Sequence, residues 1–195
     1  MTLVLASNNK DKLREIREIL DGTGISVISQ SEAGCHFEAE ENGASFTENA
    51  RIKAKAALAA TGLPCVADDS GIEIDALDGG PGIYSSRYVG DRTYAETCRE
   101  IIKIADEKGV RGCRFVCAVV CVFPDGREIT ALGKVEGTVA KDLKGEGGFG
   151  YDPMFYLEHL GKTMAELSED EKNSLSHRGR AFREFAGKLK ETGIC

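Results

Sequence analysis

The stretch Arg114-Phe115-Val116-Cys117-Ala118-Val119-Val120-Cys121-Val122-Phe123 is apolar at almost every position. A strand with one wet face alternates polar and apolar residues, so a run that is apolar on both faces predicts a strand at the centre of a sheet. Cys113, Cys117 and Cys121 share strand parity and are predicted to be small buried core residues. Pro124-Asp125-Gly126 predicts a turn into a second strand over 127–133, and the two strands together predict a hairpin.

Helical patterns lie on both sides of this hairpin. A first strand over 3–6 is followed by Leu13, Ile16, Ile19 and Leu20 at helical spacing. Ser or Thr followed three residues later by Glu is a capping box, and it predicts the starts of three more helices after Ser45, Thr93 and Ser168. A final helix carries Phe182, Phe185, Ala186 and Leu189 on one face.

Further strands are expected over 71–76, 135–139 and 154–157. Helices that alternate with parallel-type strands and are joined by a hairpin predict an α/β fold, with a mixed central sheet flanked by helices. The chain has 195 residues and no shift in composition divides it, so we predict one domain over 1–195. We expect that domain to have two lobes, with the active site in the cleft between them.

Composition narrows the functional classes. The chain is 42% hydrophobic and 29% charged, and no apolar run approaches the roughly 20 residues of a membrane span. The apolar start is too short for a signal-peptide core, so we predict a cytoplasmic protein that does not bind membranes. The net charge of −7 disfavours binding to a nucleic-acid backbone. Seven cysteines without a Cys-x-x-Cys pair indicate neither a disulfide framework nor a zinc knuckle.

Two adjacent aspartates, Asp68 and Asp69, follow the apolar run 64–67. Strand interiors disfavour Asp, and Ser70-Gly71 is typical of a turn, so the strand is predicted to end at Ala67 with both carboxylates exposed. A pair of hard oxygen ligands suits Mg²⁺. The alternative is an ordinary turn with solvated aspartates.

A second candidate is Ser7-Asn8-Asn9-Lys10-Asp11-Lys12, between the first strand and the first helix. Backbone N–H groups and the helix dipole favour an anion there, so the hydroxyl, amide and ammonium groups predict a phosphate-binding loop. It lacks the glycines and the Gly-Lys-Ser/Thr ending of a Walker A loop, which disfavours a P-loop kinase or ATPase. The alternative is a helix N-cap with solvated lysines.

The acidic run Glu38-Ala39-Glu40-Glu41-Asn42 precedes the second helix, on which Asn49 and Lys53 share one face. Such a run is often only a solvated loop, and Lys53 could reach a phosphate or be solvated. In Gly147-Gly148-Phe149-Gly150-Tyr151-Asp152-Pro153, glycines allow close approach to a flat ligand and the aromatic rings offer stacking surfaces. Lys172 and Ser176-His177-Arg178-Gly179-Arg180 add donors near a helix start.

Several blocks occur together in chain order: Ser7-x-Asn9-x-x-Lys12, Phe46-x-Glu48-Asn49-Ala50 with Lys53, Ala67-Asp68-Asp69-Ser70-Gly71, Pro81-Gly82-Ile83-Tyr84-Ser85-Ser86-Arg87, Gly148-Phe149-Gly150-Tyr151-Asp152-Pro153, and Ser176-His177-Arg178. This order resembles the inosine/xanthosine triphosphate pyrophosphatase family, over nearly the whole chain. The resemblance implies Mg²⁺-dependent hydrolysis of a non-standard purine nucleoside triphosphate such as ITP, dITP or XTP, giving the monophosphate and pyrophosphate. It also implies a homodimer.

The resemblance gives the site residues their roles. Asp69 is the implied catalytic carboxylate and holds the metal with Glu40. Chemistry alone leaves Glu41 as an alternative ligand. It also leaves open whether Asp68 contributes to binding the metal or the attacking water. The implied triphosphate contacts are Ser7, Asn8, Asn9, Lys10, Asp11, Lys12 and Lys53, and Ser70 is a further implied substrate contact. The implied base contacts are Phe149, Gly150, Tyr151, Asp152, Lys172, His177 and Arg178.

Base selection would follow from hydrogen bonding. A donor such as the Arg178 guanidinium donates to the 6-carbonyl of hypoxanthine or xanthine, whereas adenine would leave that donor unpaired at a cost of about 1–3 kcal/mol. Guanine also has the 6-carbonyl, and its rejection is not explained. Two rival functions remain: a Maf-like nucleotide pyrophosphatase, whose serine- and arginine-rich opening loop is absent at 7–12, and a nucleotide sensor without turnover, which has little need for a hydrolytic metal site.

Overall fold

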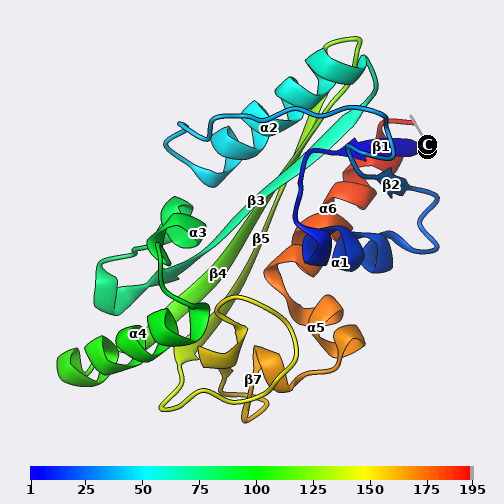
Figure 1. Cartoon of the computed structure of the whole chain (residues 1–195). Helices are drawn as coiled ribbons and strands as arrows, with labels where there is room; N and C mark the ends of the chain where they lie inside the picture. The colour runs from blue at the N-terminus through cyan, green and yellow to red at the C-terminus, as the bar shows by residue number, and fades with distance from the viewer. Residues whose placement is uncertain (194–195) are drawn as a thin grey trace. The chain divides into compact units, whose positions relative to one another are not determined.

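The structure is a computed structural model that describes residues 1–193, so residues 194 and 195 of the expected domain lie outside the described part. Figure 1 shows the helices and strands along the chain. The strands are β1 (Thr2–Leu5), β2 (Ser26–Ile28), β3 (Cys65–Ile74), β4 (Gly112–Val122), β5 (Glu128–Val139), β6 (Phe155–Leu157) and β7 (Lys162–Thr163). The helices are α1 (Lys10–Leu20), α2 (Phe46–Thr61), α3 (Ser85–Tyr88), α4 (Tyr94–Lys108), α5 (Glu169–Leu175) and α6 (His177–Glu191).

Within residues 1–193 the strands form a seven-stranded sheet in the order β2-β1-β3-β4-β5-β6-β7. β1 is parallel to both β2 and β3, whereas β6 is antiparallel to both β5 and β7. The sheet is therefore mixed, and the predicted α/β class is confirmed. None of the helices in this part of the chain combines the length and the apolar character needed to cross a membrane.

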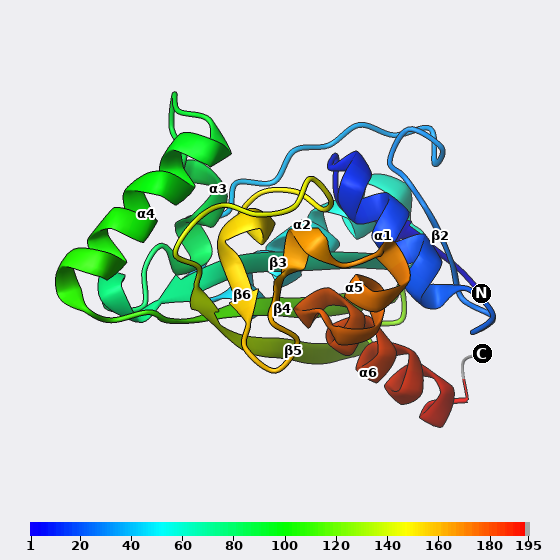
Figure 2. The same ribbon diagram turned by 90° about the horizontal axis from the view of Figure 1, so that it is seen from below.

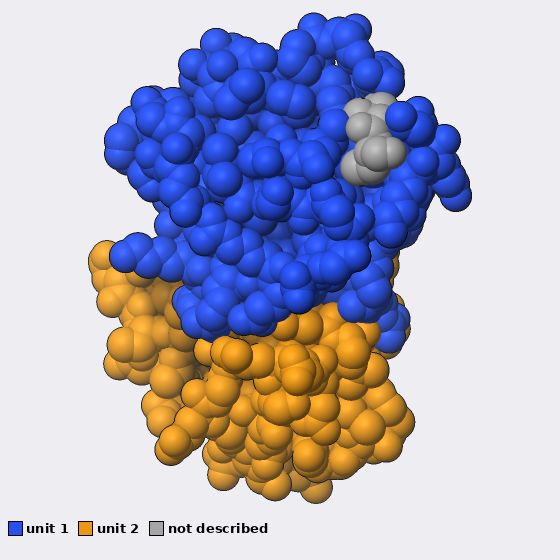
Figure 3. Space-filling model, turned by 90° about the vertical axis from the view of Figure 1, so that its right-hand side faces the viewer, with its two compact units in different colours: residues 1–69, 117–133, 177–195 blue, residues 70–116, 134–176 orange. Residues whose placement is uncertain are grey.

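The chain divides into two compact units, which Figure 3 colours separately. Among the described residues, unit 1 comprises 1–69, 117–133 and 177–193, and unit 2 comprises Ser70–Val116 and Lys134–Ser176. The divisions fall inside β3, β4 and β5, so each of these strands contributes residues to both units. The predicted cleft stays a prediction.

In unit 1 the sheet is covered on both faces by helices, as Figures 1 and 2 show. Leu3 and Leu5 of β1 belong to the buried cluster that contains apolar residues of α1 and α6. Val4 and Ala6 belong instead to the cluster that contains the alanines of α2. Because alternate strand residues point to opposite faces, α1 and α6 cover one face and α2 covers the other.

In unit 2 a separate buried cluster joins α4 to the parts of β3, β4 and β5 that belong to this unit. Ile101, Ile102 and Ala105 of α4 supply the apolar face that the sequence predicts, and all three are buried. The stretch 148–157 also contributes to this core, through Tyr151, Met154 and Phe155.

The local signals for helix starts are confirmed. The Ser45 hydroxyl accepts a hydrogen bond from the Glu48 backbone N–H, and complete capping boxes begin α4 at Thr93 and α5 at Ser168. α2 ends at Gly62, which adopts the left-handed conformation that glycine tolerates.

The central hairpin is confirmed as well. Cys113, Cys117 and Cys121 in β4 are each at most 1% exposed. β4 lies next to β5 in the sheet, and the Phe123 N–H donates to the Arg127 carbonyl at 3.0 Å across the turn between them.

The predicted strand end at Ala67 is wrong. β3 continues without a break from Cys65 to Ile74, and Asp68 and Asp69 are buried in its middle, 1% and 6% exposed. Asp is disfavoured in strands because its carboxylate needs partners that a strand interior rarely supplies. Here side chains from α1, α2 and α6 supply them, so the carboxylates remain buried without a turn.

The separate strands predicted over 127–133 and 135–139 are one strand, β5. Gly133, which suggests a strand end in the sequence, marks instead a close approach to α6. A Cβ at this position would lie 2.0 Å from the His177 carbonyl oxygen and 2.5 Å from the Ala181 nitrogen. Only glycine allows the two backbones to come so near.

Candidate active site

The candidate site in unit 1 begins at the carboxyl end of β1. The chain leaves β1 toward α1 on one face of the sheet and enters β3 from α2 on the other face. The helices that lead to the two neighbours of β1, the strands β2 and β3, therefore lie on opposite faces of the sheet. Open α/β sheets bind ligands at the carboxyl end of a strand whose two connections diverge in this way.

The loop 7–12 lies at this end and includes the first turn of α1. The Asn9 side-chain oxygen caps the helix, accepting hydrogen bonds from the N–H groups of Asp11 at 2.9 Å and Lys12 at 3.1 Å. Ser7 is half-buried, whereas Asn8 and Lys10 are exposed. The structure therefore supports the N-cap reading for Asn9 and leaves the exposed donors available to an anion.

Asp68 points toward α1 and α6. Its Oδ2 lies 2.8 Å from the Lys12 ammonium and 3.6 Å from the Arg178 guanidinium. Burial alone would raise the pKa of Asp68, but these two positive charges outweigh burial and hold the pKa well below its ordinary value. Asp68 is therefore a permanently ionised carboxylate and a weak proton acceptor.

Asp69 points to the opposite face, toward α2. Its Oδ1 accepts from the Lys53 ammonium at 3.0 Å, and its Oδ2 accepts from the Asn49 side-chain amide at 3.3 Å. Burial raises the pKa of Asp69 above its ordinary value, although Lys53 opposes this effect. Asp69 is thus the more basic carboxylate of the pair.

The acidic run reaches the candidate site through Glu41. The Glu41 carboxylate lies 2.8 Å from the Lys53 ammonium, and Glu41 is half-buried. Glu40 is exposed. The Gly43 N–H donates to the Asn49 side-chain oxygen at 2.9 Å, which holds the acidic run against the start of α2. The structure therefore places Glu41 beside Lys53, which also contacts Asp69, and Glu40 stays a predicted metal ligand.

These carboxylates fit a Mg²⁺ ion that is shared with phosphates. Among residues 1–193, no group of three or more His, Cys, Asp and Glu side chains is arranged to hold a metal. Mg²⁺ is commonly bound by only one or two carboxylates, with substrate phosphates and waters as the other ligands. Asp69 and Glu41 both point at the Lys53 ammonium, so they are able to face a single cation.

Arg178 and His177 begin α6 and are buried in unit 1. Besides Asp68, the Arg178 guanidinium contacts the Glu15 carboxylate at 2.6 Å. Glu15 is only 4% exposed and is a site residue that the sequence analysis missed. Its position three residues after Lys12 places it on the same face of α1, and this spacing is the signal that could have found it.

The spacing of Asn49 and Lys53 predicts that the two residues share one face of α2, but it predicts no function for Asn49. The structure shows it fully buried, with its amide bridging the acidic run and Asp69.

In unit 2 the glycine-rich loop forms a small aromatic and ionic cluster. The Lys172 ammonium lies 2.7 Å from Asp152 Oδ2 and 4.6 Å from the centre of the Phe149 ring. The Phe149 N–H also donates to Asp152, at 2.8 Å. Gly148 makes this closure possible, because a Cβ there would lie 2.2 Å from the same carboxylate oxygen. Phe149 is therefore held in a fixed position while half-buried.

Tyr151 is part of the core of unit 2 instead of lying open beside Phe149. It is 5% exposed, and its hydroxyl donates to the Ser85 carbonyl at 2.7 Å. Its ring packs edge-on against Tyr94, with the ring centres 5.3 Å apart. Gly150 and Ser70 are both half-buried.

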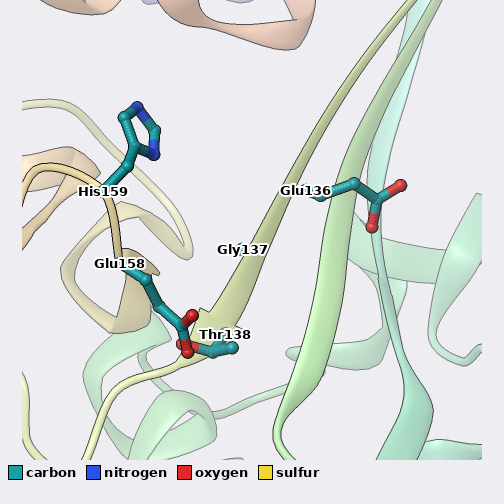
Figure 4. Close-up of a pocket in the computed structure, with 5 residues that line it drawn as sticks. All are labelled: Glu136, Gly137, Thr138, Glu158 and His159. Atoms are coloured by element: carbon teal, nitrogen blue, oxygen red, sulfur yellow. The ribbon is translucent and has the colours of Figure 1, made fainter.

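Unit 2 also contains a hollow that is lined by other residues. It has a volume of about 570 Å³ and is lined by Glu136, Gly137, Thr138, Glu158 and His159. Figure 4 shows the Glu136 carboxylate and the His159 ring pointing in different directions, so the polar groups do not converge on one point. None of the residues singled out in the sequence lines this hollow.

Comparisons with known proteins give consistent matches over the length of the chain. The profile of the Ham1 family matches residues 3–188. A dITP/XTP pyrophosphatase of Thioalkalivibrio sulfidiphilus (strain HL-EbGR7) is 48% identical over 195 residues, covering 97% of this chain and 99% of its own length. A dITP/XTP pyrophosphatase of Desulforamulus reducens (strain ATCC BAA-1160 / DSM 100696 / MI-1) is 46% identical, with 94% and 92% covered.

Solved structures agree with the observed architecture. A HAM1 protein from Coxiella burnetii superposes with a TM-score of 0.88 at 39% identity, covering 98% of this chain and 99% of that one. The Staphylococcus aureus Ham1 protein superposes with a TM-score of 0.87 at 38% identity, covering 98% of this chain and 100% of that one.

Proposed function

The chain belongs to the Ham1 family, which confirms the predicted family, and from this premise we propose that it hydrolyses non-standard purine nucleoside triphosphates. The substrates are dITP, ITP and XTP, and the products are the nucleoside monophosphate and pyrophosphate. Its role is to remove these nucleotides from the pool, as a homodimer in the cytoplasm.

The observation that carries the proposal is the contrast between Asp68 and Asp69. Asp68 is neutralised by two cations and has a low pKa, so it serves as a fixed counter-charge. Asp69 faces α2, where Glu41 and Lys53 lie, so its carboxylate is beside the groups that would hold the metal and the triphosphate. This arrangement supports Asp69 as the group that takes a proton from the attacking water.

Asp69 and Glu41 would hold Mg²⁺ together with the triphosphate; Glu40, the ligand implied by the resemblance, is exposed. When bound, Mg²⁺ neutralises charge on the phosphate oxygens and lowers the pKa of a nearby water. Lys12 is held near the start of α1 by Asp68 and is in place before a substrate arrives, whereas Lys53 contacts Asp69 and Glu41 and has to rotate to reach a phosphate. Both ammonium groups stabilise the negative charge that grows on the pyrophosphate leaving group.

Phe149, Lys172 and Asp152 of unit 2 offer the chemistry for a purine base. Phe149 presents a ring for stacking, and its orientation is fixed by the Asp152 carboxylate and the Lys172 ammonium. Hydrogen-bond donors select a 6-carbonyl purine over adenine. Arg178 is the donor expected from the sequence, and its guanidinium already contacts Glu15 and Asp68 in unit 1.

The first prediction tests the reaction directly. Purified protein is incubated with Mg²⁺ and, separately, dITP, ITP, XTP, ATP and GTP, and both pyrophosphate and orthophosphate are measured. We expect pyrophosphate from the first three nucleotides, with a kcat/KM at least about a hundredfold above that for ATP, which is a lower bound for selection by hydrogen bonds.

The products separate the rival functions. Orthophosphate as the only phosphate product would contradict cleavage between the α and β phosphates. Binding of these nucleotides with no turnover of any of them would favour the sensor.

A further inference from the structure

Lys53 lies between the two carboxylates that fit a metal ion. Its ammonium is 3.0 Å from Asp69 Oδ1 and 2.8 Å from Glu41 Oε1, and its side chain is 14% exposed. An ammonium that contacts two carboxylates is stabilised in its charged form. Lys53 therefore remains a cation at neutral pH, held where a second cation would have to bind.

The backbone that carries Lys53 is fixed, whereas its side chain contains several rotatable bonds. Ala50 and Ala54 on either side of it are fully buried against the sheet, and Ser45 caps the same helix. A lysine has a flexible four-carbon chain that ends in a point charge. The ammonium can thus leave the two carboxylates by rotation of the side chain alone, and Asn49 would still hold Asp69 in position.

We propose that Lys53 is a resident counter-cation that occupies the metal position of the nucleotide-free protein. Mg²⁺ then binds tightly to Asp69 and Glu41 only after a triphosphate attracts the ammonium away from them. This inference rests on the proposed function, because it takes the triphosphate as the group that displaces Lys53. It makes metal binding depend on substrate, so the free protein does not retain Mg²⁺.

The physical basis is electrostatic. Two carboxylates that share one ammonium are already partly neutralised, and a second cation beside that ammonium meets repulsion. A triphosphate brings several negative charges, which compensate for both cations at once. The same ammonium therefore opposes the metal when substrate is absent and contacts phosphate when substrate is present.

The second prediction is a calorimetric titration of Mg²⁺ into metal-free protein without nucleotide. In Lys53→Met the repulsion is removed, so we expect Mg²⁺ to bind about tenfold or more tightly than to the wild type, the scale on which one close charge shifts a carboxylate equilibrium. Lys55→Met is the matched control, because Lys55 lies on the same helix and is exposed. Its Mg²⁺ affinity should equal that of the wild type.

Two further measurements locate the gained site. In the double variant Lys53→Met/Asp69→Asn the gain in affinity should be lost, and saturating Mg²⁺ should raise the Tm of Lys53→Met more than that of the wild type. Equal or weaker Mg²⁺ binding by folded Lys53→Met would overturn the inference. These readouts need no turnover, so a failure of the proposed function would show separately, as absent pyrophosphate release by the wild type.

Discussion

Neighbouring residues in a strand face opposite sides, and in β3 this separates Asp68 from Asp69 chemically. Asp68 meets Lys12 and Arg178, whereas Asp69 meets Lys53 and Asn49. Asp68 therefore has two cationic partners and Asp69 has one, and the pKa values of the two carboxylates shift in opposite directions although the residues are adjacent in the chain.

The third prediction concerns Asp69→Asn. The amide keeps the shape of the carboxylate but accepts no proton, so pyrophosphate release from dITP should fall by at least about a hundredfold, the lower range for loss of a general base. Glu73→Gln is the control, since Glu73 lies on the same strand and its parity places it on the same face. It should keep wild-type kcat, with circular dichroism showing that both variants are folded. Asp69→Asn with a kcat near that of the wild type would remove Asp69 from the catalytic role.

The sequence identifies Asp68 and Asp69 as candidate functional residues, but it does not predict that they are buried within a strand. Local preference predicts a turn at Asp68 and Asp69, because the preference of Asp for turns is a property of the residue alone. The partners that keep both residues in a strand come from α1, α2 and α6, far away in the chain. For the same reason Glu15 was missed, since its partner Arg178 is 163 residues away.

At the scale of elements, β5 and α6 approach so closely at Gly133 that no side chain fits between them. The fourth prediction is that Gly133→Ala destabilises the protein by about 1–3 kcal/mol, the usual cost of overpacking, because the new methyl group would meet the His177 carbonyl and the backbone of Ala181. Urea unfolding measures the change.

Gly187→Ala is the matched control for this prediction. Gly187 lies within α6, and a Cβ there would meet nothing within 4 Å. Alanine favours a helix over glycine, so this variant should be more stable than the wild type by about 0.5–1 kcal/mol. Equal stability of Gly133→Ala and the wild type would mean that α6 can shift away from β5 without cost.

Helix starts and strand ends differ in how well the sequence predicts them. The predicted helix starts at Ser45, Thr93 and Ser168 are correct because a capping box uses only residues within one helical turn. Gly133 misleads because a glycine needed for a tertiary contact looks the same in sequence as a glycine that ends a strand.

For the whole molecule, the α/β class and the mixed sheet follow from the order of helical and strand patterns, and both are confirmed. The sheet order is not contained in those patterns. β3 lies between β1 and β4 because α1 and α2 cover opposite faces, and this depends on which buried surfaces fit each other.

The buried cysteines of β4 allow the cooperativity of the molecule to be measured by chemical labelling. Cys113 belongs to unit 2, whereas Cys117 and Cys121 belong to unit 1. Burial raises the pKa of Cys113 and of Cys121, so neither thiol reacts until its surroundings open.

The fifth prediction is that a thiol reagent, applied in increasing urea, labels all three cysteines at the same urea concentration, as peptide mass spectrometry would show. Three strands are common to both units, and breaking one unit breaks strands of the other. Labelling of Cys113 at a lower urea concentration than Cys117 would instead show that unit 2 unfolds by itself. The native thiols thus serve as reporters of unfolding in each unit, and no label has to be engineered into the protein.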